Sequence, residues 1–327
     1  MPIPHDRRTV LKKLAAATLA PAFSGLALAD TYPSRPINLV VPFAAGGMTD
    51  ILGRQLGKSI TTSWGTPAIV DNRLGAGGII GADRVAKAPA DGYNLLITTT
   101  AHVVNPAITK KLPYDTLGDF TPIAMLARTP NVLLVHPGIP ANNLQELLAY
   151  ARKKGGVTYG SSGTGGTTHL SGELLASKAN APFIHVPYKG TALAINDLIG
   201  KQIDASFVDA LSAVKYVESG TLRAIAVSTK DRNPALPQVP TIAEQGVPGY
   251  ETEIWIGLYG PAKLPAQLVD KLNKIALESM AEPDFKNMMA KQGTQNGTMD
   301  VNAFQAYVPS EMAKWADICK LANIQPA

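Results

Sequence analysis

Cysteine is almost absent from this 327-residue chain, which holds only Cys319. A single cysteine excludes an internal disulfide, so the fold must depend on burying apolar side chains, and we expect a buried structural thiol. Metal-ligand spacing is also missing. His102, His136, His169 and His185 come from separate segments, and none forms an H-x₃-H or H-E-x-x-H pattern. The sequence therefore predicts no metal site and no cofactor.

No apolar run reaches the roughly 20 residues that a membrane-spanning helix needs. The nearest, "LAAATLAPAFSGLALA" (residues 14–29), is interrupted by Pro21, follows a basic stretch and ends in the small-x-small triplet Ala27-Leu28-Ala29. This pattern is typical of an export signal over residues 1–29, cleaved before Asp30, and predicts an extracytoplasmic protein. The stretch "DRRTVLKK" is close to a twin-arginine signal, so the Sec and twin-arginine routes both stay open.

Excess charge of one sign is also lacking once the signal is set aside. Residues 1–29 hold four basic residues and one acidic residue, so the rest carries 26 basic and 24 acidic residues, a net charge of +2. Such a balance argues against a nucleic-acid partner.

Short runs rich in valine and isoleucine, such as "INLVVPF", "NLLITTT" and "VLLVHP", alternate with helix-length amphipathic segments. This alternation predicts an α/β fold with mainly parallel sheets flanked by helices. Helix starts are expected with Thr49 or Asp50 as a cap, with Asn142 or Asn143 as a cap supported by Glu146, and at Pro265.

The chain that follows the predicted signal, residues 30–327, is longer than a single hydrophobic core usually supports, which favours two lobes. The stretches 122–138 and 250–265 are extended, apolar and bounded by prolines, so they can cross between lobes. We expect one lobe from residues 30–128 plus 252–327, the other from residues 129–251, and a hinge that allows closure.

The stretch "YGSSGTGGTTHLSGE" (159–173) is rich in glycine and hydroxyl residues. It has no lysine, which a phosphate-binding loop requires. A nucleophile elbow needs a glycine where Thr164 stands. A dinucleotide-binding fingerprint needs a glycine where Thr168 stands. What remains is a cradle of backbone N–H groups and hydroxyls at a helix start, suited to a carboxylate. The alternative is a tight strand-to-helix turn.

A similar loop, "PFAAGGMTD" (42–50), ends the first predicted strand. Parallel sheets place ligands at the carboxyl ends of their strands, which favours binding by both loops. Asp50 suits a helix cap better than a ligand contact. Asp209 can face a cleft or cap the next helix, and His169 can donate to an anion or simply pack.

These segments, together with "HVPYKGTALAINDLIGKQID" and "WIGLYGPAKLP", resemble the periplasmic solute receptors of tripartite tricarboxylate transporters, the Bug (Bordetella uptake gene) type. The resemblance spans residues 31–325. It implies a two-lobed, type II clamshell that captures a small carboxylate and delivers it to integral-membrane permease subunits, as a monomer and not an enzyme.

By motif match, the resemblance implies pincers over residues 43–50 and 161–169, with further lining near residues 100–104 and at Asp209. Met48 and the Val208-Asp209-Ala210 segment depart from the usual family pattern, which leaves the contacts of the ligand's distal half open. The expected ligand-binding residues are Phe43, Ala44, Ala45, Gly46, Gly47, Met48, Thr49, Asp50, Thr100, Ala101, His102, Ser161, Ser162, Gly163, Thr164, Gly166, Thr167, Thr168, His169, Tyr188 and Asp209.

Two other functions stay open. One is an exported esterase-like hydrolase using Ser162 with His169, which lie seven residues apart. The other is a ligand-sensing partner of a membrane regulator. The ligand itself is not defined, because Tyr93, Tyr188 and Trp255 can floor an aromatic site or simply pack. Monocarboxylates, dicarboxylates, aromatic acids and acidic amino acids all remain.

Overall fold

Alternating strands and helices account for most of the chain in the computed structural model, which describes residues 32–326. The predicted export signal and its cleavage site lie outside these residues. All described helices and strands belong to the compact unit Arg35–Ala327. Within residues 32–326, no helix is both long and apolar enough to cross a membrane.

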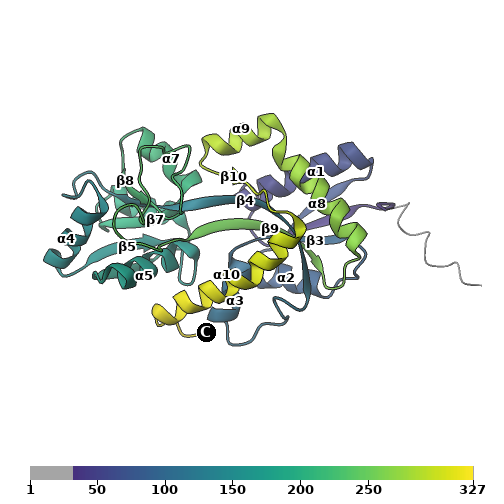
Figure 1. Ribbon diagram of the computed structural model, residues 1–327, viewed down its shortest axis with the longest axis horizontal. Coiled ribbons are helices and arrows are strands. Elements are labelled where there is room, and N and C mark those ends of the chain that lie inside the picture. Colours follow the sequence, from purple (N-terminus) through teal and green to yellow (C-terminus); the bar gives the residue numbers. More distant parts are fainter. Residues whose placement is uncertain (1–31, 327) are drawn as a thin grey trace, which may run out of the picture. The chain divides into compact units, whose positions relative to one another are not determined.

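Strands of this unit form one continuous ten-stranded sheet, whose main path is β2-β1-β3-β9-β4-β7-β5-β6, with β10 and β8 also paired to β4 (Figure 1). The strands are β1 (Ile37–Val41), β2 (Ala68–Asn72), β3 (Asn94–Thr99), β4 (Phe120–Val135), β5 (Val157–Ser161), β6 (Phe183–Pro187), β7 (Ala205–Asp209), β8 (Arg223–Val227), β9 (Glu253–Pro261) and β10 (Gln295–Asn296).

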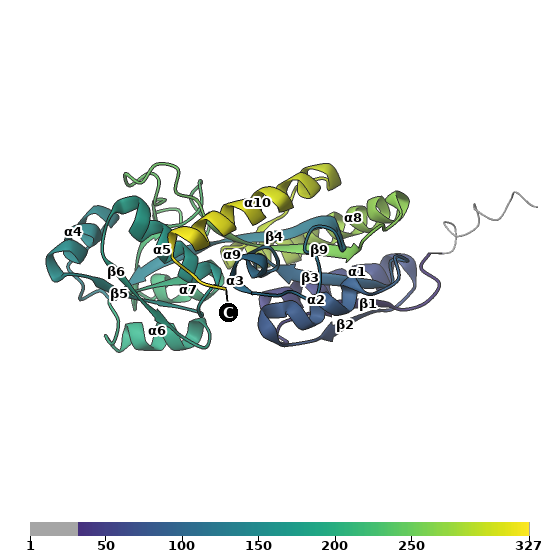
Figure 2. The ribbon, with the colours of Figure 1, turned by 90° about the horizontal axis from the view of Figure 1, so that it is seen from below.

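Parallel strands lie toward each end of this path and antiparallel strands lie in the middle. β1 pairs in parallel with β2 and β3, and β5 with β6 and β7. β4 runs antiparallel to β9 along residues 120–130 and then to β7 along residues 131–135. The two-lobed α/β fold is thereby confirmed, with β4 and β9 as the long strands between the lobes (Figure 2). The antiparallel pairing in the middle was not predicted.

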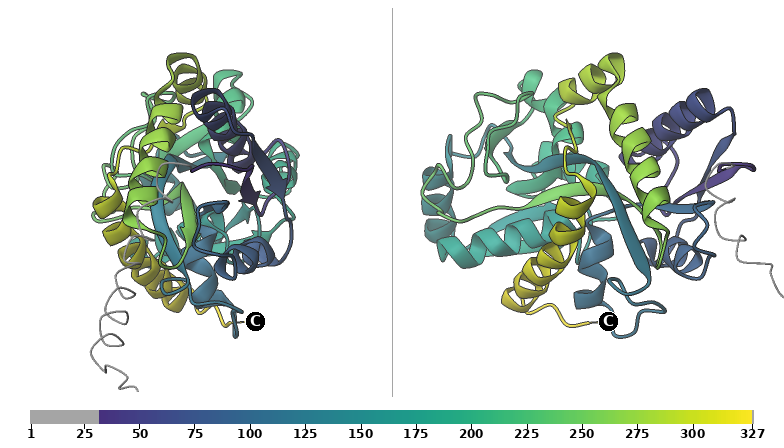
Figure 3. Two further views of the ribbon diagram at one scale, coloured as in Figure 1. Left: turned by 90° about the vertical axis from the view of Figure 1, so that its right-hand side faces the viewer. Right: turned by 45° about the vertical axis from the view of Figure 1, so that its right-hand side comes forward.

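Helices flank both lobes. They are α1 (Met48–Trp64), α2 (Ile79–Ala86), α3 (Ala101–Ile108), α4 (Leu144–Lys154), α5 (Thr167–Ala179), α6 (Thr191–Ile199), α7 (Ala210–Glu218), α8 (Ala266–Ala281), α9 (Pro283–Lys291) and α10 (Val301–Leu321), with a short 3₁₀ turn, η1 (Ala76–Gly78). The last helix, α10, packs against α3, α5 and β4, so it touches elements of both lobes (Figure 3). The lobe boundaries at residues 129 and 251 stay a prediction.

Helix ends test the predicted caps. Asn143 caps α4 by accepting the N–H of Glu146, as predicted. The Glu146 carboxylate accepts the N–H of Asn142 at 2.7 Å, one residue before the cap that a capping box would use. Pro265 precedes α8 as expected. The cap predicted at Thr49 or Asp50 is wrong, because α1 begins at Met48 after Gly47. Cys319 is buried as predicted, and burial raises the pKa of its thiol to about 11.

Candidate functional site

Both glycine-rich loops connect the carboxyl end of a parallel strand to a long helix. The first joins β1 to α1, and the second joins β5 to α5. The first three N–H groups of an α-helix have no partner within the helix, and the positive end of the helix dipole lies beside them. The intrahelical bonds begin with Ile51 N–H to Gly47 in α1 and Leu170 N–H to Gly166 in α5. Each loop therefore leads into a set of donors suited to an anion.

Helix α3 lies between the two loops. On one side, Asn105 donates to the carbonyl of Gly77 at 3.2 Å, and Gly78 packs against Pro42 and Phe43 of the first loop. On the other side, Gly165 of the second loop packs so closely on Ile108 that a Cβ atom there would lie 2.7 Å from the isoleucine side chain. Loops from the two lobes thus approach the same helix.

Asp50 holds the first loop in place. Its carboxylate accepts the N–H of Gly46 at 2.9 Å, two bonds from Arg54 at 2.8 and 3.0 Å, and one from Asn72 at 3.0 Å. Asn72 also donates to the carbonyl of Phe43 at 3.1 Å. The hydrogen bond from Arg54 contributes most to lowering the pKa of Asp50. Because its oxygens are occupied and its charge is paired, Asp50 positions the loop and is poorly placed to contact a ligand.

Replacing Asp50 with alanine is expected to loosen this loop and to lower the free energy of unfolding by about 1–3 kcal/mol, since a buried hydrogen-bonded acceptor is lost. Amide hydrogen exchange at Gly46 should accelerate. The matched control is Asp317→Ala, which removes an ion pair with Lys320 on the exposed surface of α10. Equal exchange at Gly46 in both variants would contradict the assigned role.

Internal hydrogen bonds also hold the second loop. Thr168 Oγ1 accepts the N–H of Ser162 at 3.0 Å and lies 2.9 Å from Ser162 Oγ. Ser161 Oγ accepts the N–H of Gly163 at 3.2 Å, and His169 Nδ1 accepts the N–H of Gly165 at 3.0 Å. The expectation that the glycine N–H groups converge on a ligand is therefore wrong for Gly46, Gly163 and Gly165. Those donors shape the loops and leave the first-turn N–H groups of α1 and α5 for an anion.

Two stacked imidazoles lie beneath the second loop. The rings of His169 and His185 are 3.7 Å apart at their centroids. Burial, followed by the neighbouring His185, lowers the pKa of His169 to about 4, and burial lowers that of His185 to about 4. Neutral His169 accepts from Gly165 and places Nε2 3.7 Å from Glu173. It is therefore a support for the loop, and the structure does not place it as an anion donor.

The arrangement of hydroxyls argues against the hydrolase alternative. Ser162 Oγ is paired with Thr168, while His169 is engaged with Gly165. The serine that contacts a histidine is Ser161, whose Oγ lies 2.6 Å from His185 Nε2, but Ser161 is fully buried. A nucleophile must reach its substrate, so neither serine has the environment of a catalytic one.

The other predicted residues have mainly structural contacts. Thr100 is fully buried, and its Oγ1 accepts the N–H of Trp255 at 2.9 Å. Tyr188 donates to Asp197 at 2.7 Å, and burial raises the pKa of its phenol to about 12. Asp209 caps α7 by accepting the N–H of Ser212 at 2.9 Å, which agrees with the capping alternative. Ligand contacts for these residues stay a prediction.

Tyr93, Tyr188 and Trp255 do not form a shared aromatic surface for a ligand. Trp255 is fully buried and donates to Glu311, while Tyr93 packs beneath the Arg35 guanidinium at 4.1 Å. Tyr188 is turned toward Asp197. These rings pack within the protein and do not define the ligand's chemistry.

His102, in the first turn of α3, is enclosed by the rings of Tyr114, Phe120 and Tyr259. It is 1% exposed, and burial lowers its pKa to about 3. In the unfolded chain this pKa returns to near 6.5. The stability that neutral His102 contributes is thus fully present above pH 6.5 and is lost as the pH falls toward 3.

His102→Phe is expected to reduce the acid loss of stability by about 1.4 kcal/mol per pH unit between pH 6 and pH 4, because it removes one proton uptake on unfolding. Phenylalanine suits the surrounding rings. Urea unfolding at several pH values measures the slope, to which His169 and His185 still contribute. An unchanged slope would refute the assignment.

Two contacts of the segment that precedes β10 could not be predicted from local sequence, one within the first lobe and one with the second. Thr294 Oγ1 lies 3.7 Å from Met48 Sδ, at the start of α1. Gly293 lies against Ala210, at the start of α7. The segment before β10 therefore touches the first turn of α1 in one lobe and of α7 in the other.

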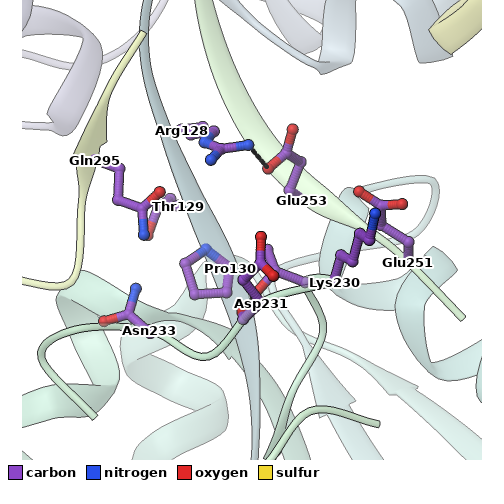
Figure 4. Close-up of a pocket in the computed structure, with 10 residues that line it drawn as sticks. Arg128, Thr129, Pro130, Lys230, Asp231, Asn233, Glu251, Glu253 and Gln295 are labelled. Atoms are coloured by element: carbon purple, nitrogen blue, oxygen red, sulfur yellow. Dashed lines mark hydrogen bonds and ion pairs between the residues drawn. The ribbon is translucent and has the colours of Figure 1, made fainter. Parts of the chain in front are cut away.

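A small pocket of about 80 Å³ lies beside the end of the antiparallel pairing of β4 with β9 (Figure 4). Its charged lining consists of two cations and three carboxylates: Arg128, Lys230, Asp231, Glu251 and Glu253. Arg128 lies 4.0 Å from Glu253, whose other oxygen accepts from Tyr307. Burial raises the pKa of Glu253. Excess negative charge makes this pocket unsuited to a carboxylate, and it contains no predicted site residue.

Two lobes joined by the long strands β4 and β9, each with a glycine-rich loop leading into a helix N-terminus, form the architecture of a two-lobed binding protein. Within residues 32–326, no group of three or more histidine, cysteine, aspartate or glutamate residues could hold a metal. Residues 52–324 match the profile described as tripartite tricarboxylate transporter family receptor. The chain belongs to this family.

Relatives agree with this assignment. Protein BugT of Bordetella pertussis is 32% identical over 295 residues, covering 89% of this chain and 90% of BugT. The R. palustris protein Rpa4515, solved with adipate, is 35% identical with a TM-score of 0.80, covering 90% of this chain and all of that one. MatC of Rhodopseudomonas palustris, solved with bound malate, is 30% identical with a TM-score of 0.75. The match covers 88% of this chain and 99% of MatC. The predicted Bug-type receptor is confirmed.

Proposed function

We propose that this receptor captures a small organic carboxylate between the loops 42–50 and 161–169 in the periplasm, and hands it to the integral-membrane subunits of a tripartite tricarboxylate transporter. The observation that carries the proposal is the pair of helix N-termini, one in each lobe, whose donors are left unused while the loops around them are held by internal bonds. Adipate and malate in two relatives support the same ligand class.

Within the loops 42–50 and 161–169, no unpaired acidic side chain opposes an anion. Asp50 is paired with Arg54, and both histidines beneath the second loop are neutral at pH 7. Thr49, Ser162, Thr164 and Thr167 carry hydroxyls next to the first-turn N–H groups. Backbone dipoles and ordered water would therefore supply most of the stabilisation of the carboxylate. Better contacts with both loops in the closed form would drive closure.

Thermal unfolding of ligand-stripped protein with a panel of mono-, di- and tricarboxylates tests the proposal. A ligand at 100 times its Kd adds about 2.7 kcal/mol to the stability. Ala45→Glu places a carboxylate in the exposed first loop and should abolish the shift, whereas Ala45→Gln, of the same size, should retain it. A panel without any shift, or equal shifts in both variants, would refute carboxylate binding at this place.

A further inference from the structure

An apolar pocket of about 530 Å³ lies beside α8, α9 and the segment 293–298, apart from the two glycine-rich loops. Figure 1 shows α9 next to β10 and above the end of α8. The apolar lining of the pocket comes from Leu277, Ala281 and Ala290 on α8 and α9 and from Pro234 in the segment between β8 and β9. The size is in the range of small-molecule sites.

Charge on the pocket lining has one sign. Lys286 is its single charged side chain, and no aspartate or glutamate lines it. Lys286 is exposed, and within residues 32–326 it forms no ion pair with an acidic group. The remaining lining residues between Gly293 and Thr298 are glycine, threonine and amides. Pro234, Ala281 and Ala290 are exposed, so the pocket is open to solvent. An open apolar pocket with one cation that has no acidic partner is complementary to an amphipathic anion.

We propose that this pocket is a second binding site, and that its ligand is a medium-chain monocarboxylate whose alkyl chain lies against Leu277, Ala281 and Pro234 while its carboxylate pairs with Lys286. This site differs in chemistry from the first one, where backbone and hydroxyl donors surround an anion without an apolar chamber.

The position of the pocket links it to the first site. Thr294, which lines the pocket, contacts Met48 at the start of α1, and Gly293 contacts Ala210 at the start of α7. Pro234 and the helices α8 and α9 come from segments on either side of β9. A bound alkyl chain therefore touches the segment that joins the two lobes, and coupling between the sites would be reciprocal.

Calorimetric titration with octanoate tests the proposal. Wild-type protein is expected to bind it, Lys286→Glu to weaken binding at least tenfold, and Ala290→Trp to abolish it by filling the chamber. Lys291→Glu, which makes the same charge change on the same helix outside the pocket lining, is expected to bind as the wild type does.

A titration repeated with Ala45→Glu protein separates the two sites. Octanoate binding that persists supports a second site, and binding that disappears assigns octanoate to the loops and overturns the proposal. Absence of octanoate binding by the wild type, or binding unchanged in both Lys286→Glu and Ala290→Trp, overturns it as well. The thermal shifts with small carboxylates, compared between Ala45→Glu and Ala45→Gln, test the first site separately, so either proposal can fail while the other stands.

Discussion

Replacing Glu311 with leucine is expected to lower the free energy of unfolding by about 3–5 kcal/mol, one of the two largest effects that the structure predicts for a single substitution. Glu311 is 3% exposed on α10, and its Oε2 accepts the indole N–H groups of Trp255 and Trp315, each at 3.0 Å. Its Oε1 pairs with Lys314. Leucine would leave two fully buried indole donors without an acceptor, each costing about 1–3 kcal/mol.

Glu311→Gln separates the hydrogen bonds from the charge. Glutamine keeps a carbonyl oxygen that can accept from both indoles and loses only the ion pair, so its loss should be well below that of leucine. Glu278→Leu, on the exposed face of α8, should change stability by about 0.5 kcal/mol or less. Urea unfolding measures all three. Equal losses for the leucine and glutamine variants at position 311 would show that the indole bonds contribute little.

Gly293→Ala is the second large prediction, with an expected loss of about 2–4 kcal/mol. Gly293 has a φ of +74°, and a Cβ there would lie 2.7 Å from the Ala210 side chain. Its carbonyl accepts from Thr129 at 3.2 Å and Asn233 at 2.8 Å, so the backbone is held in place. Left-handed strain costs about 1–2 kcal/mol and overpacking about 1–3 kcal/mol.

Two further variants divide these costs. Gly220 has a similar φ of +70° with open space around it, so Gly220→Ala should show the strain alone. Adding Ala210→Gly to Gly293→Ala should relieve the clash and recover the packing part. Ala210→Gly alone is measured as well. If the stability loss of the double variant equals the sum of the two single losses, the contact between Gly293 and α7 does not limit stability.

Much of the fold could be read from local pattern. Valine- and isoleucine-rich runs separated by amphipathic segments predicted the strands and helices, because burial on both faces requires such runs. Asn143 and Glu146 predicted the start of α4, since capping-box bonds lie within four residues. The antiparallel pairing of β3, β9 and β4 was missed, because pairing partners more than a hundred residues apart leave no mark in local periodicity.

The two predicted strand-to-helix loops are present, and ligand binding between them stays a prediction, but contacts of residues within the loops differ from those expected. Asp50 looked like a cap and proved to be an anchor for Gly46, because Asn72 and Arg54 come to it from β2 and α1. For His169 the sequence left anion donation and packing open, and the structure shows its ring accepting the N–H of Gly165. Whether the His169 ring donates or accepts depends on which group lies against it in the fold, and the spacing of residues along the chain does not contain that information.

By itself, the sequence determined the α/β class, the family, the two glycine-rich loops and the absence of disulfide and metal-ligand patterns, since these depend on residue type and short-range spacing. Only the tertiary structure decided which N–H groups are bonded within the loops, that His102 is enclosed by aromatic rings, and that residues 293–294 contact the starts of α1 and α7. Those features arise where segments distant in the chain pack together, and packing of side chains at that range is set by the whole fold.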